Sequence, residues 1–143
     1  MNYLTQKLLN TEELELLKIN LAKHEKLWED GKKTAGNHAA KVKKNLQLKR
    51  DSDVSRKYSR LITQKLLQND LIKSFALPKK IHGTMFTKSF AGMKYGRHID
   101  NAYMATGRAD LSFTMFLSAK DHYDGGDLVI ENLNSENKFK LDS

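Results

Sequence analysis

The chain opens with a stripe of large apolar residues at helical spacing, formed by Leu14, Leu17, Leu21 and Trp28. Lysines lie off this stripe, as on the solvated face of an amphipathic helix. Asn10 precedes it, and its side chain can accept hydrogen bonds from the free N–H groups of a first helical turn. The pattern predicts a helix that begins after Asn10 and ends at Gly31.

A second stripe at helical spacing predicts a helix over residues 55–75. We expect its buried side to consist of Tyr58, Leu61, Ile62, Leu66 and Phe75. Leu77 and Pro78 end it, because the residue before proline avoids the helical region and proline cannot continue the hydrogen-bond ladder. The polar stretch 32–53 between the two helices is expected to be irregular, with a turn at Gly36.

From Ile81 onward the apolar pattern changes to the alternation typical of strands. We predict five strands, at residues 85–90, 95–100, 111–117, 127–131 and 138–141. Residues 111–117 alternate most regularly, and a connection at 132–135 joins the last two strands into a hairpin. Helices followed by short strands indicate an α+β domain with an antiparallel sheet or barrel.

Composition narrows the class of protein. The 143 residues are 39% hydrophobic and 29% charged, which is the balance of a single globular domain. No apolar run approaches the roughly 18 residues of a membrane span, and the N-terminus lacks a signal-peptide pattern, so we expect a cytoplasmic protein without a membrane partner. The absence of cysteine excludes disulfides, thiolate metal sites and iron–sulfur clusters.

The net charge of +8 is concentrated in the first 80 residues. Such charge is compatible with a nucleic-acid partner, but the basic residues follow no recognisable binding motif. We therefore interpret them as a solvated helical surface and do not expect nucleic acid as the partner.

His98 and Asp100 are the candidate metal ligands. In an extended chain, residues two apart point to the same face, so one segment can offer an imidazole and a carboxylate together. Two histidines and one carboxylate on one face are the ligand set of non-haem Fe(II) oxygenases.

Seven sequence runs carry a family resemblance. In chain order, they are Trp28-Glu29-Asp30-Gly31, Thr34-Ala35-Gly36, Val42-Lys43-Lys44-Asn45, Tyr95-Gly96-Arg97-His98-Ile99-Asp100-Asn101, Arg108-Ala109-Asp110-Leu111-Ser112, Phe116-Leu117-Ser118 and Tyr123-Asp124-Gly125-Gly126-Asp127-Leu128. With them, the chain resembles the Fe(II)- and 2-oxoglutarate-dependent dioxygenases of the prolyl/lysyl hydroxylase class, and most closely their PKHD-type hydroxylase branch. The resemblance covers nearly the whole chain.

The resemblance implies that the protein is an oxidoreductase. It also implies a single domain in which N-terminal helices (residues 1–80) pack on part of a double-stranded β-helix, or jelly roll (residues 81–143). It implies His98 and Asp100 as Fe(II) ligands and Tyr95 and Phe116 as walls of the 2-oxoglutarate pocket. Arg108 and Asp110 would brace the loop behind the metal.

The implied activity is a hydroxylase reaction that couples 2-oxoglutarate decarboxylation to C–H hydroxylation. O₂ is consumed, ascorbate keeps the iron reduced, and the substrate is a prolyl or related protein side chain or a small molecule.

Two family features are missing from the sequence: the second ligand histidine on a late strand, and the Arg or Lys that follows it and pairs with 2-oxoglutarate. The first interpretation is a chain truncated before these residues. The second is a complete, inactive binding module, or an oligomer in which a partner chain supplies the third ligand. The third is a basic nucleic-acid-binding protein that shares only the fold.

Overall fold

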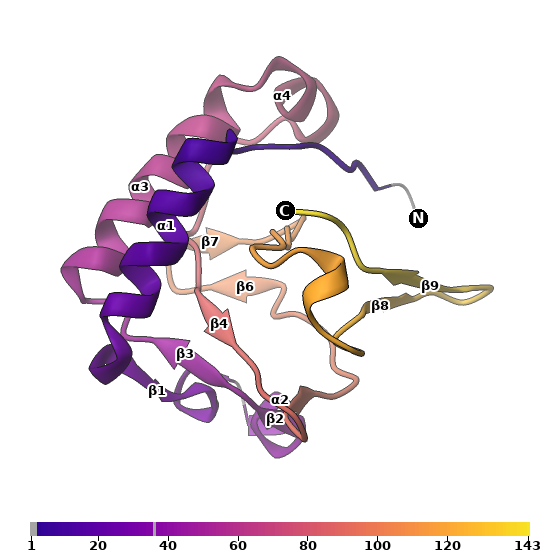
Figure 1. Ribbon diagram of the computed structural model, residues 1–143. Helices are drawn as coiled ribbons and strands as arrows, with labels where there is room; N and C mark the ends of the chain where they lie inside the picture. Colours follow the sequence, from indigo (N-terminus) through magenta and orange to yellow (C-terminus); the bar gives the residue numbers. More distant parts are fainter. Residues whose placement is uncertain (1–2, 36) are drawn as a thin grey trace.

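Two long helices form one side of the molecule, as the hydrophobic spacing predicts. The computed structural model describes residues 3–35 and 37–143, and it places α1 (Thr11–Lys23) beside α3 (Asp53–Gln68), with the strands on the other side (Figure 1). The hydroxyl of Tyr58 on α3 donates to the carbonyl of Leu16 on α1 over 3.1 Å. Among the described residues, no helix combines the length and apolar composition needed to cross a membrane.

Helix α1 begins where the sequence predicts and ends earlier. Asn10 Oδ1 accepts from the Glu13 N–H at 2.8 Å, and Glu13 Oε2 accepts from the Asn10 N–H at 3.0 Å, which completes a capping box. The helix stops at Lys23 because His24 leaves the helical conformation and its ring contacts the Asn20 carbonyl. The predicted end at Gly31 is therefore wrong. Trp28 instead opens strand β1 (Trp28–Asp30), which follows the 3₁₀ turn η1 (Glu25–Leu27).

The second predicted helix is two helices. Tyr58, Ile62 and Leu66 of α3 are buried as expected. At Gln68 the helix ends, because the Asn69 side chain accepts from the Ile72 N–H at 3.0 Å and caps a new helix, α4 (Asp70–Ala76). Phe75, predicted to be buried, is 44% exposed on α4.

The described residues of the polar stretch 32–53 include two helical segments and two strands, so the prediction that this stretch is irregular is wrong. It contains the 3₁₀ turn η2 (Gly31–Thr34), helix α2 (Asn37–Val42) and strands β2 (Lys43–Lys44) and β3 (Leu46–Leu48). Strand β3 lies in the middle of an antiparallel sheet in the order β1-β3-β4, where β4 is Thr87–Lys88. The turn predicted at Gly36 lies outside the described residues.

The hydrophobic core lies between the two long helices and this three-stranded sheet. Its buried members are Leu9, Leu14, Leu17, Leu48, Val54, Tyr58, Ile62, Leu66 and Phe86. All of them come from the first 86 residues, and Met115 and Leu117 pack against the core from outside.

The remaining strands form three separate pairs, all antiparallel. They are β5 (Lys94–Tyr95) with β2, β6 (Tyr103–Met104) with β7 (Gly107–Arg108), and β8 (Leu128–Glu131) with β9 (Glu136–Phe139). The β8–β9 hairpin, which follows the 3₁₀ turn η3 (Lys120–His122), confirms the predicted hairpin and lies far from the helices (Figure 1).

Of the strand predicted at residues 85–90, only β4 is present, and of the one predicted at residues 95–100, only Tyr95 lies in a strand, at the end of β5. The strand predicted at residues 111–117 is wrong. Residues 111–117 have no strand partner in the described chain, and a strand needs one for its backbone hydrogen bonds. The mixed α+β class is confirmed. The double-stranded β-helix and the boundary at residue 80 stay predictions.

Candidate functional site

The pairing of β5 with β2 holds the segment that carries the candidate metal ligands. Lys43 lies opposite Tyr95 in this pair, and the Gly96 N–H donates to the Val42 carbonyl at 2.8 Å just beyond it. A Cβ atom on Gly96 would lie 3.0 Å from the Val42 Cβ, so the close approach of the two segments leaves little room for a side chain. The β2–β5 pair therefore fixes the position at which the segment with His98 and Asp100 begins.

His98 and Asp100 lie side by side, although they are not in a strand. Strand β5 ends at Tyr95, and the His98 ring folds back until its Nδ1 is 2.8 Å from the Gly96 carbonyl oxygen. With the proton on Nδ1, this nitrogen donates to the carbonyl and leaves the lone pair of Nε2 free. Nε2 lies 3.4 Å from Asp100 Oδ1.

This separation fits two neighbouring ligands of one metal ion. Ligand atoms about 2.1 Å from a metal in adjacent octahedral positions lie about 3 Å apart. Metal-binding histidines commonly donate their second ring N–H to a carbonyl, as His98 does to Gly96. The side chains of His98 and Asp100 are 25% and 66% exposed, so the face between them is open to solvent.

Tyr95 packs against the imidazole. The rings of Tyr95 and His98 are stacked, with centroids 3.8 Å apart and an interplanar angle of 12°. Partial burial raises the pKa of the Tyr95 phenol, and the negative charge of Asp100 raises it further. Tyr95 is therefore a neutral wall beside His98 at physiological pH.

Sequence reasoning missed Lys43, which is 2% exposed and contacts the same tyrosine. Its Nζ lies 5.0 Å from the centroid of the Tyr95 ring and 3.4 Å from Gln47 Oε1. Burial lowers the pKa of the Lys43 ammonium and the charge of Arg50 lowers it further, while Asp30 opposes the shift. No sequence pattern indicates this contact, because it depends on the pairing of two segments about 50 residues apart.

Arg108 and Asp110 form an ion pair behind the loop, with Nε 2.7 Å from Oδ1. The carbonyl of Arg108 also accepts from His82 Nε2 at 3.0 Å, and Thr106 contacts the other ring nitrogen at 2.6 Å. His82 thus holds the β6–β7 hairpin from outside it. The role of Arg108 and Asp110 in supporting a metal stays a prediction.

A second ion pair ties the site segment to the β8–β9 hairpin. Arg97 Nε lies 2.6 Å from Glu131 Oε2. The pair connects the residue before His98 to the end of β8.

Phe116 lies in a different environment from Tyr95. It lines a small cavity of about 80 Å³ together with residues of the N-terminal segment and the C-terminal tail, among them Leu8, Leu9 and Leu141. Tyr95, His98 and Asp100 are not among the residues that line this cavity. The role of Phe116 as a wall of a 2-oxoglutarate pocket therefore stays a prediction.

The described residues place two candidate metal ligands at this site, His98 and Asp100. Within residues 3–35 and 37–143, no three His, Asp or Glu side chains lie close enough to hold one metal ion. His98 and Asp100 fit part of a metal site.

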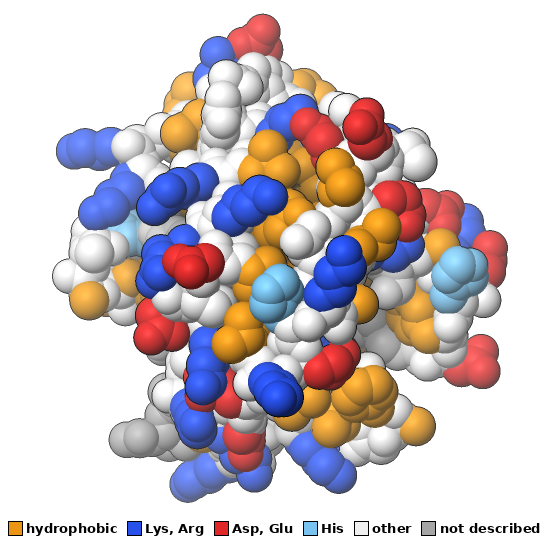
Figure 2. Space-filling model, turned by 60° about the vertical axis from the view of Figure 1, so that its left-hand side comes forward, with side chains coloured by type: hydrophobic (Ala, Val, Ile, Leu, Met, Phe, Trp, Pro, Cys, Tyr) orange, Lys and Arg blue, Asp and Glu red, His pale blue; other side chains and the backbone are white. Residues whose placement is uncertain are grey.

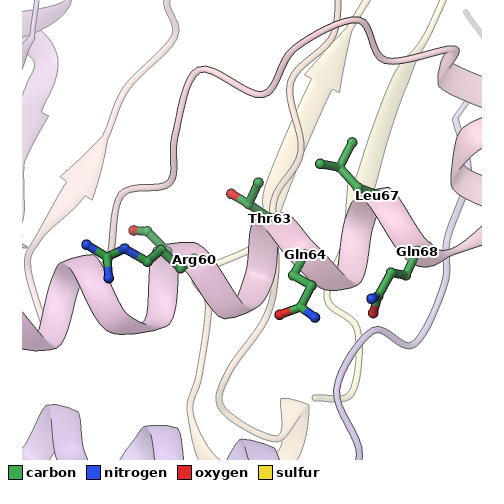
Figure 3. Close-up of a pocket in the computed structure, with 6 residues that line it drawn as sticks. Arg60, Thr63, Gln64, Leu67 and Gln68 are labelled. Carbon is green, nitrogen blue, oxygen red and sulfur yellow. The ribbon is translucent and has the colours of Figure 1, made fainter.

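A wide, open hollow of about 520 Å³ lies elsewhere, along α3 (Figure 3). The residues that line it, which include Arg60, Gln64 and Gln68, all belong to that helix. None of the candidate ligands lies there. The view from the helical side shows lysine and arginine side chains spread among acidic and apolar ones rather than gathered in one stripe (Figure 2).

Comparison with known proteins finds relatives that share one name. No protein-family model matches the chain. Its sequence is 69% identical to a protein named PKHD-type hydroxylase from Prochlorococcus marinus strain MIT 9215, over 100% of this chain and 65% of that relative. Relatives of the same name from strains MIT 9515 and NATL1A are 64% and 51% identical, over 100% and 99% of this chain and 65% and 64% of their own length.

The chain thus spans just under two thirds of the length of the curated relatives that it matches, and the similarity covers nearly all of its residues. This confirms the resemblance on which the sequence interpretation rests. Over nearly all of its residues, the chain is similar to proteins named PKHD-type hydroxylase.

Proposed function

We propose that this chain carries the His98–Asp100 half of the Fe(II) site of a 2-oxoglutarate-dependent hydroxylase. The name of its relatives supports a hydroxylase, which is an oxidoreductase. The metal, the co-substrate and the activity of the whole protein are parts of this proposal.

The observation that carries the proposal is the relation of the two candidate ligands. His98 Nε2 and Asp100 Oδ1 lie 3.4 Å apart, and the second nitrogen of His98 is engaged by the Gly96 carbonyl. An ordinary surface ion pair needs no such fixed tautomer, whereas a metal ligand benefits from one.

Bound Fe(II) together with 2-oxoglutarate supplies O₂ activation, coupling decarboxylation of the co-substrate to hydroxylation of a C–H bond. In this chain, His98 and Asp100 hold the metal, and the Tyr95 ring covers one face of the imidazole against water. We propose ascorbate as the reductant that keeps the iron in the Fe(II) state. The substrate is a protein side chain, such as a prolyl residue, or a small molecule.

The third protein ligand is the open part of this proposal. The described residues place two donors at the site, and the relatives are longer than this chain. We propose two sources for a third donor and for a cation that pairs with the far carboxylate of 2-oxoglutarate. They are residues like those in the part of the relatives that this chain does not match, or a second copy of the chain.

Metal binding is the first test. The chain is titrated anaerobically with Fe(II), and in parallel with Co(II), whose visible spectrum reports its ligands. We expect binding that is lost in both His98→Ala and Asp100→Ala and is retained in His122→Ala, a matched control in η3. Equal affinity in all four proteins would contradict the proposed site.

Turnover is the second test. O₂-dependent formation of succinate from 2-oxoglutarate is measured with and without ascorbate. We expect little turnover by the 143-residue chain, since two protein ligands hold iron weakly. Metal binding without turnover fits the proposed half-site, and turnover that disappears in His98→Ala shows that the third ligand is available within this chain or its oligomer.

A further inference from the structure

Lys43 is buried in a way that packing alone does not explain. It is 2% exposed, and the closest acceptor recorded for its ammonium is Gln47 Oε1 at 3.4 Å. Removing an ammonium from water is costly unless hydrogen bonds or charges replace the water. A methionine or leucine would fill the same space without that cost. The position of the charge therefore suggests a use for it.

The ammonium lies over a ring that is itself stacked on His98. Lys43 and Tyr95 are directly opposite each other in the β2–β5 pair, and Lys43 Nζ is 5.0 Å from the ring centroid. The same ring lies 3.8 Å from the imidazole centroid of His98 and nearly parallel to it. Lys43, Tyr95 and His98 thus form one continuous series of contacts that ends at a candidate metal ligand.

Two other lysines that lie over aromatic rings have strong partners of their own. Lys88, over Trp28 at 4.6 Å, is paired with Glu25 at 2.8 Å. Lys140, over Tyr123 at 4.4 Å, donates to the Tyr123 carbonyl at 2.6 Å. Lys43 lacks a comparably short contact among the described residues, so the Tyr95 ring is a principal partner of its charge. A cation–π contact is strongest when the cation is desolvated, as it is here.

We propose that Lys43 is a positioning residue of the metal site, which fixes the plane of the Tyr95 ring and, through it, the imidazole plane of His98. This inference rests on the proposed function, in which His98 binds the metal. The imidazole has two restraints: the bond from Nδ1 to the Gly96 carbonyl and the stack on Tyr95. A hydrogen bond fixes the position of one ring atom but allows the ring to tilt about it. The stack removes that freedom and keeps Nε2 directed toward Asp100.

The deciding variant is Lys43→Met, which keeps the length of the side chain and removes its charge. At one fixed pH, the NMR signals of the His98 ring protons report the stack, because the Tyr95 ring shifts them upfield. We expect this upfield shift to collapse in Lys43→Met and Co(II) affinity to fall about tenfold, as for other residues that support a metal ligand. The unfolding midpoint should stay unchanged or rise, because a buried charge has been replaced by an apolar group.

Lys140→Met is the matched control, since it removes a lysine from a different aromatic ring. It should leave both the His98 signals and Co(II) affinity unchanged. Unaltered His98 signals in Lys43→Met would overturn the proposal. So would a large loss of stability in that variant, because Lys43 would then be a structural residue of the core.

A double-mutant cycle with Tyr95→Leu tests the route of the effect. If Lys43 acts through the ring, Lys43→Met added to Tyr95→Leu causes no further loss of Co(II) affinity. Independent, additive losses would overturn the proposal. Should the unmodified chain bind no metal at all, the proposed function fails, while the His98 ring-proton signals still support or overturn the positioning role of Lys43.

Discussion

The first 86 residues and the remaining 57 are held together in different ways. Each buried hydrophobic residue of the core comes from the first region, whereas no residue from 87 to 143 is buried. In the second region, large apolar side chains such as Leu111 and Leu133 are 61% and 102% exposed. Stability therefore resides in the first region, and the candidate ligands lie in the second.

The candidate site lies where the two regions meet. Strand β5 carries the segment with His98, and it pairs with β2 of the first region. A metal site needs ligands held by a rigid support. The first region provides this support through β2, and in the second region the Arg97–Glu131 ion pair connects the site segment to the β8–β9 hairpin.

The largest expected effect distinguishes the two regions directly. Leu17 is fully buried, so Leu17→Ala should lower the free energy of unfolding by about 2–5 kcal/mol. Leu111→Ala removes the same atoms from an exposed side chain and should change it by less than about 0.5 kcal/mol. Urea denaturation followed by circular dichroism measures both. Equal losses would show that residues 111–117 are packed in solution.

Local signals in the sequence predicted the helices well where one side chain decides the outcome. Asn10 and Glu13 form their capping box within a single turn, so the start of α1 could be predicted without knowledge of the rest of the fold. The break at Asn69 is also local, but the apolar stripe continues across it and hides it. Both results follow from the same chemistry of side chains that cap a helix.

The strands were harder to predict because pairing is not local. Residues 111–117 have the clearest alternation and no strand partner, whereas β2 and β3 are paired and bury the polar residues Lys43 and Gln47. Apolar alternation therefore predicts a strand at residues 111–117 and does not predict β2 and β3.

The candidate site shows the same limit. His98 and Asp100 were predicted to meet as neighbours on one face of a strand, but they meet because the His98 ring folds back onto Gly96 and Tyr95. Lys43 could not be found from the sequence, since its contact with Tyr95 exists only once β2 and β5 have paired.

Two glycines give the next largest contrast. A Cβ atom on Gly31 would overlap Asn45 Oδ1 and lie 3.1 Å from Lys43 Cε, so Gly31→Ala should cost about 1–3 kcal/mol of unfolding free energy. Gly92 has no atom within 4 Å of such a Cβ, and Gly92→Ala should cost only the strain of its positive φ of 75°, about 1 kcal/mol. Urea denaturation compares them. Adding Asn45→Ala should relieve the cost at Gly31, and failure to do so would contradict this steric explanation.

Two asparagines accept hydrogen bonds from backbone N–H groups, and their substitution should affect different extents of the structure. Asn10→Ala removes the cap of α1 and should lower the global unfolding free energy by about 1 kcal/mol. Asn132 Oδ1 accepts from the N–H groups of Asn134 and Ser135 in the β8–β9 connection, where no core depends on it. Asn132→Ala should therefore speed amide hydrogen exchange in the hairpin without moving the urea midpoint. A shifted midpoint would show that the hairpin unfolds together with the core.

The smallest expected effect is a difference in acid sensitivity between two carboxylates. The Lys65 ammonium and the Asn10 N–H lower the pKa of Glu13, which joins α1 to α3, and Lys120 lowers the pKa of Asp142 in the C-terminal tail. A carboxyl group with a lowered pKa in the folded state adds stability above its ordinary pKa and loses it as the pH falls through the lowered value. Glu13→Gln should therefore reduce the fall in the urea midpoint between neutral pH and about pH 3. Asp142→Asn should leave that fall unchanged, because the tail that it holds is outside the core. An equal change in both variants would mean that the two regions unfold as one unit, and the contrast in burial would then have no counterpart in stability.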